Sequence, residues 1–81
     1  MKLFRKALTA NTEEVFEING QFATILNVGP GDMYVNFDKE ATTNSLLIPA
    51  GMGRSFYFGR YVKNVHVISD GTSTVQIDDM R

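Results

Sequence analysis

The sequence contains no cysteine among its 81 residues. This absence excludes a disulfide framework and any metal site built on thiolates. A chain of this length suffices for a single domain, predicted over residues 1–81, and buries only about 60–65% of its unfolded surface. Small secreted domains often need disulfides for that reason. The lack of cysteine therefore favours either a reducing compartment or stabilisation by assembly with partners.

Long hydrophobic runs are also missing. The start, "MKLFRKAL", is basic like the beginning of a signal peptide, but it is followed by the polar "TANTEEV". A signal peptide needs an apolar region of about 7–15 residues at that point. No run approaches the roughly 20 residues that span a bilayer. We therefore expect a soluble, unprocessed protein that has no membrane partner.

Neither sign of charge is in excess, because eight basic and nine acidic residues give a formal net charge of −1. This balance argues against a nucleic-acid partner, which would require a strong basic patch. The charges nevertheless fall in blocks, basic at 2–6 and 54–63 and acidic at 13–17 and 70–79. These blocks are either ordinary solvated surface or complementary patches through which copies of the chain face each other.

What the chain does contain is a series of short strand-like segments separated by turn residues. Their spacing of about 8–12 residues predicts an all-β fold, a small antiparallel β-sandwich or flattened barrel of about six to seven strands. Residues 1–12 are predicted to form an N-terminal arm or an edge strand. Asn11 and Glu14 would suit a helix capping box, but β-branched and aromatic residues follow them. The predicted strands are 13–18, 21–28, 32–38, 46–48, 54–58, 64–69 and 72–78.

Two dipeptides carry the strongest turn signals. Asn19-Gly20 and Asp70-Gly71 each separate two alternating runs, and such pairs tolerate the positive φ of a two-residue turn. They predict tight hairpins over 13–28 and 64–78, in a structure with less than about 15% helix.

Alternation within the strands predicts which side chains are buried. Phe16 and Ile18 share one face of their strand, opposite Val15. In the strand 21–28, the residues Phe22, Thr24, Leu26 and Val28 share a face. The predicted core consists of Met33, Val35, Phe37, Phe56, Phe58, Val65, Val67, Val75 and Ile77.

No constellation of reactive side chains is visible. His66 is the single histidine and alternates with buried-type valines, which predicts a surface or inter-subunit position. Neither Ser55 nor Ser69 has the surroundings of a catalytic nucleophile. The sequence therefore predicts no catalytic residue and a protein that is not an enzyme.

Metal and cofactor sites are equally hard to find. Asp32, Asp38 and Glu40 could be imagined around calcium, but the two aspartates end one strand at a separation of roughly 20 Å. Turn formation is the better interpretation of both aspartates. The glycine-rich "PAGMG" lacks the Gly-Lys-Ser/Thr of a phosphate loop. We predict no metal ligand and no cofactor.

The segment "RSFYFGRY", residues 54–61, mixes four aromatic residues with two arginines. It could be a core strand whose outward side chains bind a protein, a surface that stacks sugars or bases, or a core strand alone. We prefer the first interpretation. It makes Arg54, Tyr57, Arg60 and Tyr61 the predicted partner-binding residues.

The sequence also resembles small structural proteins of tailed bacteriophages. The resemblance covers about residues 24–77 and is carried by "DMYVNFD", the Thr-rich loop 41–45, "IPAG" and "VISDGTSTV". It implies a virion component: a capsid decoration, head–tail joining or tail-associated subunit, made in the bacterial host cytoplasm. It implies other virion proteins as partners, and it implies no active-site residues.

These observations converge on a building block. A chain with a small core gains stability by burying surface against copies of itself. We expect a closed homo-oligomer that uses 54–61 and the N-terminal arm. The alternative hypothesis is a small binding module that recognises a host-surface glycan or protein through 54–61.

Overall fold

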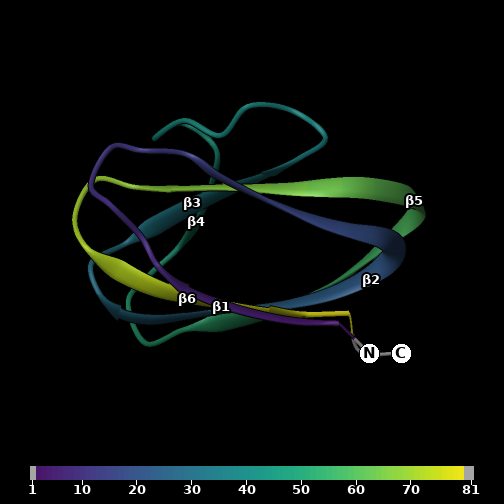
Figure 1. The fold of residues 1–81 in the computed structure, drawn as a ribbon, viewed down its shortest axis with the longest axis horizontal. Coiled ribbons are helices and arrows are strands. Elements are labelled where there is room, and N and C mark those ends of the chain that lie inside the picture. The colour runs from purple at the N-terminus through teal and green to yellow at the C-terminus, as the bar shows by residue number, and fades with distance from the viewer. Residues whose placement is uncertain (1, 80–81) are drawn as a thin grey trace.

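A computed structural model describes residues 2–79 and shows an all-β molecule built on one antiparallel six-stranded sheet (Figure 1). The strand order is β1-β6-β2-β5-β3-β4. The sheet is open, because β1 and β4 at its two ends are not paired with each other. The strands are β1 (Leu3–Ala7), β2 (Glu14–Pro30), β3 (Met33–Phe37), β4 (Leu46–Ile48), β5 (Gly53–Ser69) and β6 (Ser73–Asp78).

The two long strands, β2 and β5, run through both parts of this sheet. The start of β2 and the end of β5 pair with each other, and β3 and β4 continue the sheet from there; we call this the β3 part. The end of β2 and the start of β5 also pair, and β6 and β1 continue the sheet on the other side; we call this the β6 part. Figure 1 shows β2 and β5 bending together at one end of the molecule, between the two parts.

The bend has a local cause in each strand. In β2 the register against β5 shifts on both sides of Gly20, and Asn19 has a φ of 50°. In β5, Gly59 has a φ of 69°, a conformation that side chains other than glycine rarely adopt. Bulges of this kind increase strand twist and turn a strand from one part of a sheet into the next.

The hairpin predicted over 13–28 is therefore wrong. Asn19 adopts positive φ as the dipeptide signal requires, but the chain bends at Gly20 and continues along the same partner strand. A reversal there would pair 13–18 with 21–28 and take β5 away from both segments. The long β2–β5 pairing stabilises the chain through hydrogen bonds between residues far apart in the sequence, which a turn dipeptide cannot indicate.

The hairpin predicted over 64–78 is wrong as well. β5 and β6 are consecutive but unpaired, because β6 lies between β1 and β2. The Asp70-Gly71 turn instead carries the chain from the β3 part to the β6 part. It is held there by Ser69, whose hydroxyl donates to the Asp32 carbonyl at 2.6 Å and accepts the Gly71 N–H at 3.2 Å.

The first residues form an edge strand. β1 pairs with β6 from Leu3–Asp78 to Ala7–Thr74. Leu8 then enters the core, and its N–H donates to the Ser73 carbonyl at 2.7 Å. Asn11 lies in a turn with a φ of 60°, and residues 2–79 contain no helix. The prediction of low helix content is confirmed for the described residues.

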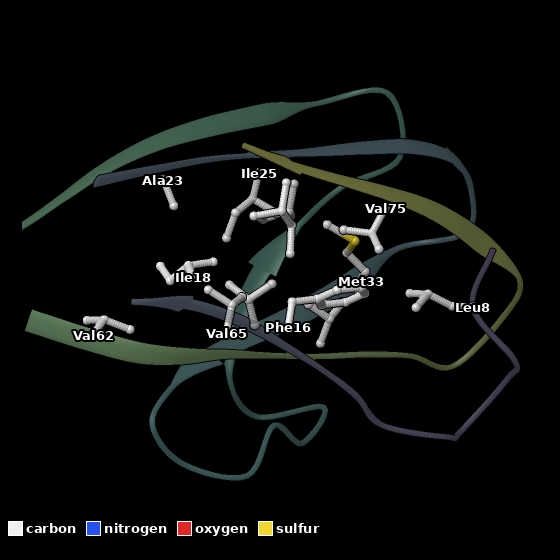
Figure 2. Close-up of a cluster of buried hydrophobic side chains, with 13 residues drawn as sticks. Leu8, Phe16, Ile18, Ala23, Ile25, Met33, Val62, Val65 and Val75 are labelled. Atoms are coloured by element: carbon white, nitrogen blue, oxygen red, sulfur yellow. The ribbon is translucent and has the colours of Figure 1, made fainter. Parts of the chain in front are cut away.

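The core lies between the two parts of the sheet. Figure 2 shows Ala23 and Ile25 of β2 pointing inward from one side, and Val62 and Val65 of β5 from the other. Six of the nine predicted core residues are buried as expected: Met33, Val35, Val65, Val67, Val75 and Ile77. The prediction omitted several buried residues: Leu8, Phe16, Ile18, Ala23, Ile25, Ala41, Ile48 and Val62.

The three predicted core phenylalanines are only partly buried. Phe37 packs its ring against Phe56 and Phe58, with centroids 5.1 and 4.6 Å away. Phe56 and Phe58 lie on the first half of β5, which pairs with β2 on one side and has no paired strand on the other. One side of this aromatic cluster consequently remains in contact with solvent.

This partial burial lowers the expected cost of truncating Phe37. Complete burial would make Phe37→Ala cost about 3–5 kcal/mol, and half-burial reduces this to about 2 kcal/mol. We expect a folded variant with reduced stability in urea denaturation. A loss as large as that of a fully buried phenylalanine would contradict the open aromatic cluster.

Candidate functional site

The four predicted partner-binding residues do not form one patch. Arg54 is paired with Ile25, on the inner face of the sheet, whereas Tyr57 is paired with Phe22, on the outer face. Arg60 and Tyr61 follow the bend at Gly59, and both are exposed. The bend, which the sequence pattern did not predict, separates the segment into three surfaces.

Among the described residues 2–79, Tyr57 is the most exposed large apolar side chain, with 68% of its surface in solvent. Its ring contacts that of Phe22 on β2, with centroids 4.8 Å apart. In the next outward-facing row, the hydroxyls of Thr24 and Ser55 share a hydrogen bond of 2.9 Å. Cross-strand contacts therefore fix the orientation of the Tyr57 ring and satisfy the neighbouring hydroxyls.

Arg54 belongs to the aromatic cluster on the inner face. Its guanidinium carbon lies 5.4 Å from the centroid of Phe56, within the range of a cation–π contact. Phe56 and Phe58 are nearly parallel, with an interplanar angle of 7°. Arg54 covers an open side of this cluster.

Arg60 is engaged within the chain. One of its guanidinium nitrogens lies 3.3 Å from an Asp38 oxygen. The same carboxylate accepts the backbone N–H of Asn64 at 2.8 Å and that of Lys63 at 3.1 Å. The Asn64 hydrogen bond, with help from Arg60 and Lys63, holds the pKa of Asp38 below its ordinary value, although partial burial opposes this shift.

The lowered pKa of Asp38 predicts a pH dependence of stability. A carboxylate with a depressed folded-state pKa stabilises the protein above its unfolded pKa of about 3.9, and this contribution is lost as the pH falls through the folded value. We expect Asp38→Asn to lower the melting temperature at pH 7. The difference from the parent protein should shrink below about pH 4.

Glu40→Gln is the matched control, because Glu40 is an exposed acid on the loop that follows Asp38. It should leave the melting temperature at pH 7 almost unchanged. A difference for Asp38→Asn that is the same at pH 3 and pH 7 would contradict the role given to the Asp38 charge.

Tyr61 makes a contact across the bend. Its hydroxyl donates to the side-chain oxygen of Asn19 at 2.8 Å. Asn19 is the residue with positive φ in the bulge of β2, so this hydrogen bond joins the bends of the two long strands. More than half of the Tyr61 surface is nevertheless exposed.

The outer side of the β6 part is an apolar sheet face. Strand register places Phe22 beside Tyr57, Thr24 beside Ser55, and Leu26 beside Gly53. Val28 follows Leu26 on the same face of β2 and is 55% exposed. We call the surface formed by Phe22, Thr24, Leu26, Val28, Ser55 and Tyr57 the apolar face.

In the part of the chain that the structure describes, charges lie only at the border of the apolar face, on β1 and β6. Thr24 is paired with Asp78 of β6, which is in turn paired with Leu3 of β1. Leu26 is paired in the same way with Gln76 of β6, which is paired with Arg5 of β1. Arg5 is bonded to the Gln76 side chain through two of its nitrogens. Within residues 2–79, the outward side chains of these rows carry one positive and one negative charge. Such an uncharged centre with a polar rim is typical of protein interfaces.

His66 lies on the side of β5 opposite the buried valines, as predicted. Its Nδ1 is 3.3 Å from an oxygen of Glu13, and the same oxygen accepts the Ala41 N–H at 2.7 Å. The side chain is only 17% exposed. Ser55 and Ser69, the two serines considered as nucleophiles, instead bond to Thr24 and to the backbone around Asp32.

The predicted turn aspartates do accept backbone hydrogen bonds. Asp32 accepts the Ala50 N–H at 3.2 Å, and Asp38 accepts those of Lys63 and Asn64. Within residues 2–79 no three acidic, histidine or cysteine side chains are grouped closely enough to hold a metal ion.

A buried asparagine that sequence reasoning missed organises one end of the molecule. Asn27 is fully buried, and its side-chain nitrogen donates to the carbonyls of Gly31 and Ile48, each at 2.8 Å. Its side-chain oxygen accepts the Gly29 N–H at 2.9 Å. The available signal was its position before the turn 29–31, where an asparagine side chain can bond the turn backbone.

The charge blocks are partly neutralised within the chain. Lys6 and Glu14 form an ion pair of 3.0 Å, and Arg60 pairs with Asp38. These contacts favour the simpler interpretation of ordinary surface charge for those four residues. They leave the apolar face, rather than the charge blocks, as the stronger candidate site.

The described residues 2–79 present no pocket that could enclose a ligand and no helix that could cross a membrane. Comparison of the chain with protein-family models, with curated proteins and with solved structures finds no match.

Proposed function

We propose that this protein is a non-enzymatic structural protein of a tailed-bacteriophage virion. It acts through protein–protein assembly, as a capsid decoration, head–tail joining or tail-associated subunit, with other virion proteins and copies of itself as partners. It is made in the host cytoplasm and functions in the particle. In this proposal the single sheet forms a flattened sandwich whose two parts enclose the core.

One observation carries the proposal. The apolar face presents Tyr57, Phe22 and Val28 on a regular sheet surface, and its outward residues within 2–79 include charges only at the border. Soluble monomers rarely expose contiguous apolar surface of this kind without a partner. The resemblance to small phage structural proteins supplies the class of partner.

Mass spectrometry of purified particles tests this function. We expect the chain to be present in particles of the phage that encodes it. Hundreds of copies would indicate a decoration protein, and about a dozen or fewer a neck or tail component, as symmetric assembly requires. Absence of the chain from the particles would overturn the proposal.

The second candidate function is recognition of a host-surface glycan or protein through residues 54–61. It is favoured by the rings of Tyr57 and Tyr61, both more than half exposed, since exposed aromatic rings can stack on sugars. Calorimetric titration with host-surface polysaccharide tests it. Binding that is lost in both Tyr57→Ala and Tyr61→Ala would favour this function, and the absence of binding would remove it for glycans.

A further inference from the structure

We propose that the partner of the apolar face is a second copy of this chain, packed face to face about a twofold axis. This inference rests on the proposed function, that the chain acts by assembly, and adds the surface and the symmetry through which it does so. The joint is a sheet face rather than a sheet edge or an N-terminal arm.

The charge distribution suits self-association. Arg5 and Asp78 both lie on the border that β1 and β6 form, and they are of opposite sign. The face as a whole is therefore close to neutral, and two copies do not repel each other when they meet. A face with an excess of one charge would instead demand a different partner of the opposite sign.

Two of the three hydroxyl groups of the apolar face are already paired within the chain, and the third belongs to the exposed Tyr57. The hydroxyls of Thr24 and Ser55 bond each other at 2.9 Å, and Arg5 bonds Gln76 at the border. Burying a polar group is costly mainly when it loses its hydrogen bonds, so these groups can be covered at low cost. Of the apolar face itself, the Tyr57 hydroxyl is then the group that needs a partner, and the same hydroxyl of an identical face can donate or accept that hydrogen bond.

The aromatic side chains of the apolar face are already oriented. Tyr57 contacts Phe22 across the strands with ring centroids 4.8 Å apart, and both project from paired backbone. An ordered aromatic pair loses little rotamer entropy when it is buried. Aromatic residues that become fully buried in an interface commonly dominate its binding energy.

The size of the face predicts the strength of the dimer. The apolar face together with its border on β6 and β1 spans four strands, which at about 4.8 Å per strand and about five residues of 3.4 Å cover about 19 Å by 17 Å. The projected area is about 320 Å², and the accessible surface buried over it is larger, roughly 500–600 Å² per copy, so the total is at or just below the low end for specific interfaces. We therefore expect dissociation in the micromolar range. Twofold symmetry is the arrangement that pairs a face with itself and closes the assembly at two copies.

Sedimentation of the whole chain over a concentration series tests the proposal. We expect the 9.1 kDa chain to form a dimer of about 18 kDa above micromolar concentration. Tyr57→Glu places one charge from each copy in the twofold interface, and it should weaken dimerisation at least about 100-fold. The matched control is Tyr61→Glu, because Tyr61 is also exposed but lies beyond the bend. It should leave the dimer intact, and circular dichroism should show that both variants are folded.

Amide chemical shifts of the unmodified protein locate the interface without any substitution. On dilution from about 500 to 10 µM we expect shifts in residues 22–28 and 55–57, while β4 at 46–48 stays unchanged. A species of about 9 kDa at every concentration, a trimer or larger ring, a dimer that survives Tyr57→Glu, or dilution shifts confined to β4 would each overturn the proposal.

The oligomeric state and the presence of the chain in particles test the paired face and the virion function separately. A monomer that is nevertheless present in purified particles keeps the proposed function and rejects the self-paired face. If particles then lose the chain in Tyr57→Glu but retain it in Tyr61→Glu, the occupant of the face is another virion protein. A dimer that is absent from particles keeps the paired face and rejects the virion function.

Discussion

Asn27→Asp is expected to leave the chain largely unfolded at neutral pH and 25 °C. The side-chain nitrogen of Asn27 donates to two carbonyl oxygens, those of Gly31 and Ile48, from a position with no solvent exposure. A carboxylate has no proton to donate and would bring a negative charge against both oxygens. The cost, about 3–5 kcal/mol for an uncompensated buried charge, is a large part of the stability of a small domain.

Far-UV circular dichroism and thermal denaturation measure this effect. Asn44→Asp is the control, because Asn44 is exposed in the loop before β4 and undergoes the same chemical change. It should melt like the parent protein. Cooperative unfolding of Asn27→Asp at a near-parental temperature would show that Asn27 does not organise the turns around it.

Ile25→Ala is expected to lower the free energy of unfolding by about 3–4 kcal/mol. Ile25 has no solvent exposure and lies at the centre of the core, paired with Ile77 of β6 (Figure 2). Truncating a fully buried isoleucine removes its transfer free energy and leaves a cavity, at a cost of about 2–5 kcal/mol. The cavity cannot collapse easily here, because paired strands hold the backbone on both sides of Ile25.

Urea denaturation of Ile25→Ala and Leu47→Ala tests whether the loss of stability depends on burial or on the number of carbon atoms removed. Both substitutions remove the same number of carbon atoms, but Leu47 on the edge strand β4 is 43% exposed. Leu47→Ala should cost less than about 1 kcal/mol. Equal losses in the two variants would mean that the inward direction assigned to Ile25 is wrong.

Ile25 and its neighbours show where sequence reasoning reached its limit. In 21–28 one face carries Phe22, Leu26 and Val28, and the other carries Ala23, Ile25 and Asn27. Hydrophobicity favours the first set for the core, but the structure buries the second. Asn27 can be buried because its side-chain nitrogen donates to the carbonyl of Gly31 in the adjacent turn and to that of Ile48 in β4, and the second contact is one that no local pattern reports. The same inversion leaves the more apolar set outside, where it forms the proposed interface.

The candidate site was predictable in its residue types but not in its arrangement. The exposure of Tyr57, opposite Phe56 and Phe58, follows from alternation alone. Its neighbour Phe22 comes from a strand 35 positions earlier, and only the pairing of β2 with β5 brings the rings together. The positive φ of Gly59 directs Arg60 and Tyr61 elsewhere.

The sequence by itself determined where the chain is extended and the inward direction of most of these segments, although 13–18 with 21–28 and 54–58 with 64–69 proved to be the single long strands β2 and β5. Period-two alternation over 32–38, 64–69 and 72–78 places the correct side chains in the core, because side-chain direction along a strand is a local property of the backbone. Tertiary structure decided which strands pair. Asn19-Gly20 and Asp70-Gly71 permit a tight hairpin, but β5 offers both halves of β2 a partner, and β2 and β1 offer partners to β6. Pairing energy is shared between segments far apart in the chain, so turn residues alone do not decide whether a turn becomes a hairpin, a bulge or a crossing.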